Sequence, residues 1–166
     1  MKERMPEDET GATRRQAELR YRFAKGFVDV DDFVIDAACG VGYGRDILKV
    51  PGYMGVDYHD GPRVDIVADL REWKVKVPFD VWIGLETIEH LDKLDNYIEQ
   101  AKKARKFIVI STPIVPTTHV NKWHVRDHDA DDVRAMFVDD RWYEWGMLRQ
   151  FDTAGFEYGL FAFARR

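Results

Sequence analysis

The stretch VIDAACGVGYGRDIL (residues 34–48) decides the fold class of this chain. An apolar run, FVID at residues 33–36, ends in an acid and is followed by Gly40, Gly42 and Gly44. Glycine permits a sharp turn from strand to helix and a close approach of the backbone to a ligand. The third glycine comes one residue earlier than in the dinucleotide fingerprint, and the phosphate loop G-x-x-x-x-G-K-[ST] is absent. The stretch therefore predicts a strand, a ligand-binding turn and a short helix over residues 45–49.

Working outward, helical and extended patterns alternate along the chain. Leu19, Phe23 and Phe27 recur every fourth residue, which predicts an amphipathic helix after a capping pair at Thr13 and Gln16. Further helices are expected over residues 91–101 and after Asp129, whose inner face would be Val133, Met136 and Phe137. Apolar runs predict strands at residues 53–58, 64–69, 79–85 and 106–112, and two more at 141–148 and 156–166. This alternation is typical of a Rossmann-like, mostly parallel α/β sheet with an antiparallel C-terminal end.

Length and composition limit the class of protein. The 166 residues fit a single domain, expected over residues 13–166, and residues 1–12 are polar and predicted to be flexible. No apolar run approaches the roughly 18 residues that span a bilayer, and the N-terminus lacks the apolar stretch of a signal peptide. The only cysteine, Cys39, suits a reducing compartment, so we expect a soluble cytoplasmic protein.

Three acids follow three successive predicted strands. Asp36 precedes the glycine loop, where a carboxylate would repel a phosphate but attract a cofactor carrying an ammonium and a sulfonium. The alternative is that Asp36 has no ligand and accepts hydrogen bonds from the amides of the loop. Asp57 could accept both hydroxyls of a ribose, or form a turn with the HDGP that follows. Asp69 could accept from the exocyclic amine of adenine, or simply end its strand. Because ligands of open α/β sheets bind at the carboxyl ends of strands, these acids predict one crevice.

Together these stretches resemble the motifs of class I S-adenosylmethionine-dependent methyltransferases. VIDAACGVGYG is similar to the first motif, GVDY to the second, VADL to the adenine-side motif, and FDVWIGLETIEHL to the fourth-strand motif. RYRFA resembles a helix that precedes the motifs in some small-molecule methyltransferases, and VISTP with NKWHVRDHD resembles the fifth strand and its loop. The resemblance covers residues 18–137 and implies a seven-stranded sheet. It also implies S-adenosylmethionine as the cofactor, held by Tyr21, Asp36, Ala38, Gly40, Gly42, Asp57, Tyr58, Asp69, Leu70, Leu85 and Glu86.

The chain departs from this family between the second and third strands. Only the six residues YHDGPR lie between Asp57 and Val64, so the helix that the family has there cannot form. One face of the sheet should be barer as a result, or covered by a partner chain, and a homodimer is a hypothesis. No inserted substrate domain is present, so the substrate pocket must come from the N-terminal helix and the loop over residues 113–128.

The chemistry of methyl transfer needs alignment and, for an alcohol or phenol acceptor, a base. His124 is the candidate base, unless it only packs beside Trp123, and His90 is the second candidate, unless it holds a backbone carbonyl. Trp123 is the candidate for contact with the substrate. The spacing of His119, His124, Asp127 and His128 matches no zinc pattern, so no metal is expected.

We therefore predict methyl transfer to an oxygen or nitrogen of a small-molecule acceptor. Three alternatives stay open: a module that keeps the cofactor fold without catalysis, a nicotinamide-dependent oxidoreductase, and a nucleic-acid methyltransferase. The net charge of −5 disfavours a nucleic-acid partner, although Arg14, Arg15, Arg20 and Arg22 could form a local patch. The glycine spacing and Asp36 weigh against a nicotinamide cofactor.

Overall fold

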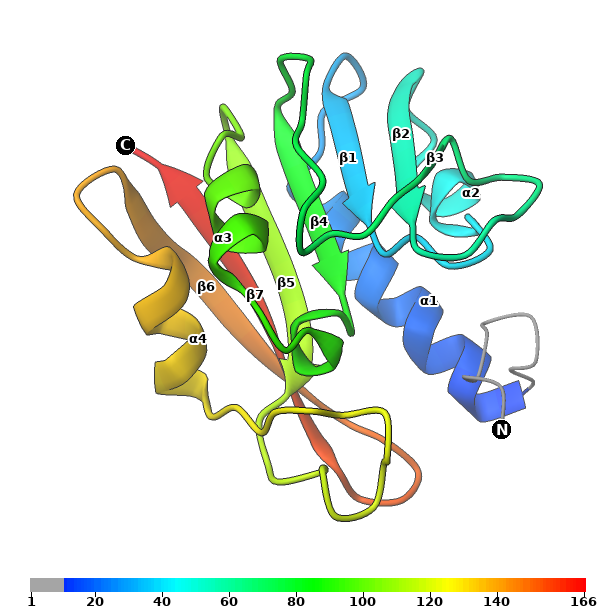
Figure 1. Cartoon of the computed structure of the whole chain (residues 1–166), viewed down its shortest axis with the longest axis vertical. Helices are drawn as coiled ribbons and strands as arrows, with labels where there is room; N and C mark the ends of the chain where they lie inside the picture. Colours follow the sequence, from blue (N-terminus) through cyan, green and yellow to red (C-terminus); the bar gives the residue numbers. More distant parts are fainter. Residues whose placement is uncertain (1–10) are drawn as a thin grey trace.

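The computed structural model describes residues 11–166, and the predicted flexible segment lies outside the described residues except for its last two positions. The sheet has seven strands in the order β3-β2-β1-β4-β5-β7-β6 (Figure 1). All neighbours pair in parallel except β5 with β7 and β7 with β6, which are antiparallel. The strands are β1 (Phe33–Ala37), β2 (Gly52–Asp57), β3 (Ile66–Val67), β4 (Val81–Leu85), β5 (Phe107–Pro113), β6 (Trp142–Phe151) and β7 (Glu157–Arg165).

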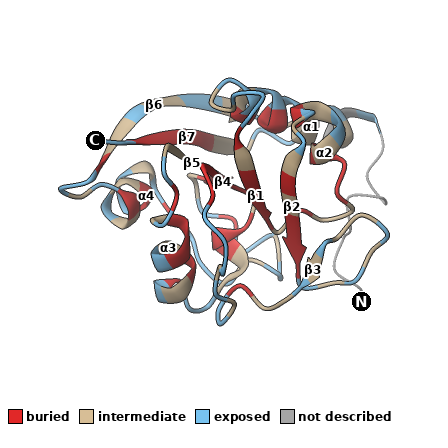
Figure 2. Cartoon of the chain, turned by 90° about the horizontal axis from the view of Figure 1, so that it is seen from above, coloured by how far each residue is buried: buried red, intermediate tan, exposed pale blue. Residues whose placement is uncertain are grey.

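Helices lie on both faces of this sheet, as Figure 2 shows from above. The described helices are α1 (Gly11–Lys25), α2 (Gly44–Leu48), the short 3₁₀ helix η2 (Ile88–His90), α3 (Asp95–Ala101) and α4 (Ala130–Phe137). Alternate residues of a strand face opposite sides of a sheet, so each central strand feeds both faces. On β4, Val81 and Ile83 pack on the side of α1 and α2, whereas Trp82 packs on the side of α3 and α4.

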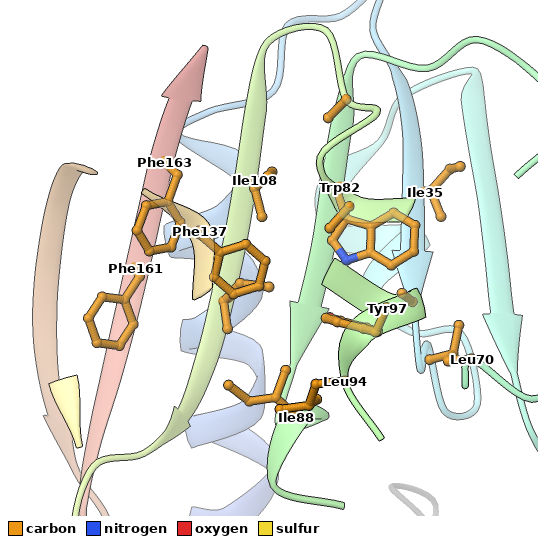
Figure 3. Close-up of a cluster of buried hydrophobic side chains, with 14 of the residues drawn as sticks. Ile35, Leu70, Trp82, Ile88, Leu94, Tyr97, Ile108, Phe137, Phe161 and Phe163 are labelled. Atoms are coloured by element: carbon orange, nitrogen blue, oxygen red, sulfur yellow. The ribbon is translucent and has the colours of Figure 1, made fainter. Parts of the chain in front are cut away.

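The core under α3 and α4 contains several aromatic pairs. Trp82 stacks edge-on against Tyr97 of α3, with ring centroids 5.3 Å apart, and Phe137 of α4 meets Phe163 of β7 at 5.2 Å (Figure 3). All four side chains are buried. Aromatic pairs of this kind add about 0.5–1.5 kcal/mol beyond the area they bury. This face therefore fixes β4, whose carboxyl end carries part of the site described below.

The predicted fold is confirmed, with differences in the bounds of several elements. The first helix begins at Gly11, so Thr13 lies inside it and does not cap its start, and the helix expected over residues 91–101 is limited to Asp95–Ala101. The third strand shrinks from the expected 64–69 to Ile66–Val67, although the flanking amides of Asp65 and Ala68 still donate to the carbonyls of Gly55 and Asp57 in β2. The second helix begins at Gly44, one residue early. Leu19 was expected on the inner face of α1 but is exposed, while Tyr21 and Ala24 are buried, so the packing face of α1 is rotated from the predicted one.

The connection between β2 and β3 contains no helix among the described residues, as its length predicted. Instead Arg63 folds back over the glycine loop and donates two 2.6 Å hydrogen bonds to the carboxylate of Asp46 in α2. Gly42, at φ +74°, has no room for a side chain, since an added Cβ would lie 2.7 Å from the Cβ of Arg63. The short connection thus covers the loop that a helix would otherwise flank.

Candidate active site

A cavity of about 830 Å³ opens at the carboxyl ends of β1, β2, β3 and β4. Its size falls within the usual range of small-molecule sites. The walls come from α1, from the loops after these four strands, from the loop over residues 121–125, and from the β6–β7 turn. Cavities of open α/β sheets form at this edge because neighbouring loops there diverge to opposite faces.

The floor of the cavity is a strained glycine loop. Ala38 has φ +66° and Gly40 has φ +58°, and Glu86, which follows the neighbouring strand β4, has φ +53°. Two non-glycine residues in this region cost of order 1 kcal/mol or more each, and such strain gathers at functional sites. The amides of Ala38 and Cys39 both donate to the carbonyl of Val56, at 2.8 and 3.1 Å, which ties the loop to β2.

Asp57 closes the same loop from the end of β2. Its Oδ2 accepts from the amide of Gly40 at 2.8 Å and its Oδ1 from the amide of His59 at 2.9 Å. Each carboxylate oxygen has two lone pairs, so both retain acceptor capacity toward the cavity, which Asp57 lines. Tyr58 lines the cavity beside it and is 65% exposed.

Asp36 does not line the cavity, which revises its predicted position. It is fully buried below the loop, where its Oδ2 accepts from the hydroxyls of Tyr21, at 2.9 Å, and Tyr53. Burial raises the pKa of this carboxyl to about 6, although both hydroxyls lower it. Tyr21 does line the cavity, so Asp36 positions that wall rather than reaching the cavity itself. Gly42 is likewise covered by Arg63 and stands off the cavity wall.

Gly44 is a glycine for the same reason of packing. An added Cβ would lie 2.2 Å from the ring of Tyr21, which crosses over the start of α2. The three glycines therefore do two different things: one borders the cavity, and two leave space for neighbouring side chains. Only Gly40 of the three glycines lines the cavity, while Gly42 and Gly44 make room for Arg63 and Tyr21.

Asp69 was expected to close the third strand but follows the end of β3 by two residues; it and Leu70 both line the cavity. The carboxylate of Asp69 is held by Arg71, whose Nη2 donates to it at 2.6 Å and whose other Nη lies 3.1 Å from Asp92. The Arg71 guanidinium lowers the pKa of Asp69. An amine that bound the Asp69 carboxylate would share the carboxylate oxygens with Arg71. Leu70, which is 7% exposed, can offer a ligand only an apolar contact.

Leu85 and Glu86 follow at the end of β4. The Oε1 of Glu86 accepts from the Ser111 hydroxyl at 2.8 Å, and its Oε2 lies 3.6 Å from a guanidinium nitrogen of Arg20. Arg20 in turn donates to Gln150 at 2.9 Å and stacks over the ring of Tyr158. This buried arginine joins α1 to the end of β4 and to β6 and β7, a role that the sequence analysis missed because its partners are distant along the chain.

Both candidate histidines lie in the cavity wall and face each other. Their ring centroids are 4.8 Å apart and the rings are perpendicular. Burial, and then the charge of His90, lower the pKa of His124 to about 4, so His124 is a neutral base at pH 7. Its Nδ1 lies 2.7 Å from the hydroxyl of Thr117. His90 Nδ1 lies 3.1 Å from the carbonyl of Trp123, which matches the alternative interpretation of His90 as a backbone partner.

Glu89 completes this corner and was not singled out from sequence. It is 1% exposed, lines the cavity, and its Oε2 accepts from the Thr112 hydroxyl at 3.1 Å. Burial, and then the nearby charge of Glu86, raise its pKa well above the ordinary value. The other three residues considered as metal ligands with His124 lie outside the cavity wall. The carboxylate of Asp127 accepts from the amides of Thr117 and Thr118, His119 is exposed, and His128 is buried.

Comparison with known proteins places this site in context. A protein of Mycobacterium tuberculosis named a probable S-adenosylmethionine-dependent methyltransferase is 27% identical over 128 residues, which cover 64% of this chain and 47% of that protein. The chain thus spans about half the length of the curated relatives it matches. No protein-family model matches the chain.

Solved structures with the same fold include several methyltransferases. The 1,6-didemethyltoxoflavin-N1-methyltransferase of Burkholderia thailandensis has a TM-score of 0.67 at 15% identity, covering 95% of this chain and 91% of that one. Magnesium protoporphyrin IX methyltransferase of Synechocystis gives 0.68 at 14% identity, with 95% and 89% covered. A geranyl diphosphate methyltransferase gives 0.72 at 12% identity, with 92% and 80% covered. The chain has the class I methyltransferase fold and resembles S-adenosylmethionine-dependent methyltransferases in sequence.

Among the described helices, none is both long and apolar enough to cross a membrane.

Proposed function

We propose that this chain is an S-adenosylmethionine-dependent methyltransferase that transfers the methyl group to an oxygen or nitrogen of a small-molecule acceptor. The observation that carries the proposal is the position of Asp57. Its carboxylate stands at the end of β2, braced by the amide of Gly40, with acceptor capacity left toward a cavity. That is the arrangement that a ribose diol requires.

The cavity walls suit the rest of such a cofactor. Leu70 supplies an apolar contact for an adenine ring, and Asp69 supplies an acceptor for its exocyclic amine. At the other end, Glu86 presents a carboxylate near the glycine loop, where an ammonium group would gain from it. Tyr21 and Ala38 close the methionine end, and Asp36 acts through Tyr21. Asp57, Asp69 and Glu86 give the cavity wall acidic groups for a cationic cofactor, although Arg71 and Arg20 pair with the last two.

The chain's own contribution to the reaction is alignment and proton removal. S-adenosylmethionine supplies a methyl group on a sulfonium, which departs as a neutral thioether when the acceptor's lone pair attacks the methyl carbon in line. The walls fix the angle between the attacking atom, the carbon and the sulfur, which can contribute several kcal/mol. His124, neutral at pH 7 and held by Thr117, can accept the proton of a hydroxyl acceptor.

The acceptor would enter beside the loop over residues 121–125. Trp123 of this loop lines the cavity and is 36% exposed, so its indole offers a flat apolar surface to a ring or a chain. The cavity volume limits the pair of ligands to a cofactor and a small acceptor. Similar structures named above act on a toxoflavin precursor, a porphyrin and geranyl diphosphate, all of which are small molecules.

A nucleic-acid acceptor gains little from the arginines of α1. Arg14 pairs with Glu18 at 2.9 Å and lies over the ring of Tyr43, and Arg20 is buried against Glu86 and Gln150. Of the four arginines first considered, two are thus engaged inside the protein. Small-molecule acceptors are therefore the ones to screen first.

The experiment is calorimetric titration of the full chain with S-adenosylmethionine and S-adenosylhomocysteine, using NAD as the negative control. Micromolar binding of both sulfur compounds is expected. Asp57→Ala should weaken it at least about 100-fold, since two charge-assisted hydrogen bonds of about 1.5–3 kcal/mol each are lost. Asp60→Ala is the matched control, because Asp60 is an exposed acid three residues further along.

An acceptor screen then separates an enzyme from a binding module. Production of S-adenosylhomocysteine that depends on an added alcohol, phenol or amine would identify the acceptor class. Binding of the cofactor without turnover on any acceptor would favour the non-catalytic alternative. Failure to bind either sulfur compound, in folded protein, would overturn the proposal.

A further inference from the structure

Glu89, His90 and His124 form a cluster in the wall of the cavity. One potential ligand atom from each lies within 4.8 Å of the other two. Glu89 and His90 come from η2, and His124 comes from the loop after β5, so the fold brings together residues more than thirty positions apart. We propose that this cluster binds a divalent transition-metal ion, with two imidazoles and one carboxylate as ligands.

The contacts of the two imidazoles suit metal ligands. His90 Nδ1 lies 3.1 Å from a backbone carbonyl, that of Trp123, and His124 Nδ1 lies 2.7 Å from the Thr117 hydroxyl. Metal-binding histidines commonly donate the other ring N–H to a carbonyl or similar acceptor, which fixes the tautomer and the ring. Both rings are therefore held in place by contacts of the kind that metal-binding histidines make.

The Glu89 carboxyl is buried and forms no ion pair with the residues that the structure describes. Glu89 is 1% exposed, and its Oε1 has no hydrogen-bond partner within residues 11–166. The ion pair of Arg20 goes to Glu86, at 3.6 Å, and none is formed by Glu89 in the described part of the chain. A buried carboxyl oxygen without a partner is costly, and a bound cation would satisfy it. Because Glu89 lines the cavity, this oxygen can be reached by an ion.

The donor set indicates which ions fit. Imidazole nitrogen suits zinc, iron, cobalt and nickel, whereas calcium and magnesium prefer sites made wholly of oxygen. Ligand bonds of about 2.0–2.2 Å place two ligands of one ion at most about 4.4 Å apart. The observed limit of 4.8 Å therefore needs only a small closure of the side chains. Three protein ligands leave coordination positions open, as in catalytic rather than structural sites.

The open positions would face the cavity where the acceptor is placed. A metal there would favour an acceptor that binds through oxygen and would lower the pKa of its hydroxyl. The metal would then replace His124 as the means of activating the acceptor, because a ring that binds the ion and contacts Thr117 has no nitrogen left to accept a proton. This statement about the acceptor rests on the proposed function. The metal site itself does not, because the cluster can bind an ion without any methyl transfer.

The test uses the full chain after treatment with a chelator. Titration with Co²⁺ alone should show one ion bound per chain, with visible absorption bands of nitrogen and oxygen ligation, and Zn²⁺ should displace it. His90→Ala and His124→Ala should each weaken Co²⁺ binding more than about 100-fold, since the loss of a group that only supports a metal ligand already costs about 10- to 100-fold. His119→Ala is the matched control, because His119 is an exposed histidine outside the cavity wall.

Glu89→Gln keeps the size of the side chain and tests the carboxylate. Thermal melts of each variant establish that it is folded. No Co²⁺ binding by the wild-type chain, or binding that both histidine variants retain, would overturn the inference. Calorimetry with S-adenosylhomocysteine is run in parallel on the same metal-free samples. A chain that binds S-adenosylhomocysteine but fails to bind Co²⁺ would refute the metal site alone. A chain that binds Co²⁺ but fails to bind S-adenosylhomocysteine would refute the proposed function alone.

Discussion

At the scale of single residues, the complete burial of the Asp36 carboxyl needs a physical explanation. An acid has been placed in the middle of the sheet, with no exposed surface and with two tyrosine hydroxyls on one of its oxygens. Those hydroxyls come from α1 and β2, so the carboxylate joins an element that covers the cavity to one that ends in it. A group that is costly to bury in its charged form is retained here because it positions Tyr21.

This gives a prediction about pH. Burial raises the pKa of Asp36 from 3.8 to about 6, so the folded state binds its proton more tightly than the unfolded chain does. The contribution of Asp36 to stability should therefore fall as the pH rises from about 4 to about 6, by up to about 3 kcal/mol. Asp36→Asn should remove this fall. Urea denaturation of both proteins at several pH values measures the difference.

The control for that comparison is Asp60→Asn, which changes an exposed acid. The difference in unfolding free energy between wild type and Asp36→Asn should change with pH, whereas the difference between wild type and the control should stay constant. Parallel curves for wild type and Asp36→Asn across the whole range would show that the carboxyl titrates normally.

At the scale of elements, the connection between β2 and β3 replaces a helix with side-chain contacts. Asp65 is its anchor: the Oδ2 accepts from the amide of Gly55 at 2.7 Å and also pairs with the guanidinium of Arg45. Arg63 of the same connection pairs with Asp46. Two arginine–carboxylate pairs thus hold β2, α2 and the glycine loop together where the sheet would otherwise be open.

Removal of this anchor should be measurable. Asp65→Ala leaves the Gly55 amide without its partner, and we expect a loss of about 1–2 kcal/mol in unfolding free energy. For a chain of this length that corresponds to about 2–8 °C in Tm. Calorimetric melts of Asp65→Ala and of Asp60→Ala, from the same connection, provide the comparison. Equal melting temperatures would mean that the connection contributes nothing to the stability of the loop.

At the scale of the whole molecule, the sheet ends in an edge strand with exposed apolar side chains. Trp145, Leu148 and Phe151 of β6 are 60%, 57% and 61% exposed, whereas Trp142 of the same strand is fully buried. Edge strands with apolar side chains tend to pair with other chains unless charge or cover prevents it.

The homodimer hypothesis is tested on this strand. Light scattering is expected to give about twice the 19.4 kDa of the chain, because pairing would bury these side chains. Trp145→Lys should shift the mass to that of the monomer. Val30→Lys is the control, since Val30 is 75% exposed and lies outside β6. A wild-type chain that stays monomeric at micromolar concentration would refute the hypothesis.

The sequence by itself determined the order of the elements, the mixed sheet and the edge at which the site forms. Apolar periodicity, the glycine loop and strand-end acids are local patterns, and strand pairing rules then leave few arrangements. Asp57, Asp69 and the two histidines could be placed at one end of the sheet on this basis, because carboxyl ends of parallel strands share an edge. The absence of a helix before β3 also followed from a count of six residues.

Only the tertiary structure decided which side chains share a cavity and which support it. Asp36 and Gly42 carry the same local signals as Asp57 and Gly40, yet the first pair is covered by Tyr21, Tyr53 and Arg63. Glu89 meets His124, and Arg20 meets Glu86, across separations that no local pattern encodes. Contacts of this kind depend on how loops fold over a finished sheet, and their energies are set by burial, which exists only once the chain is folded.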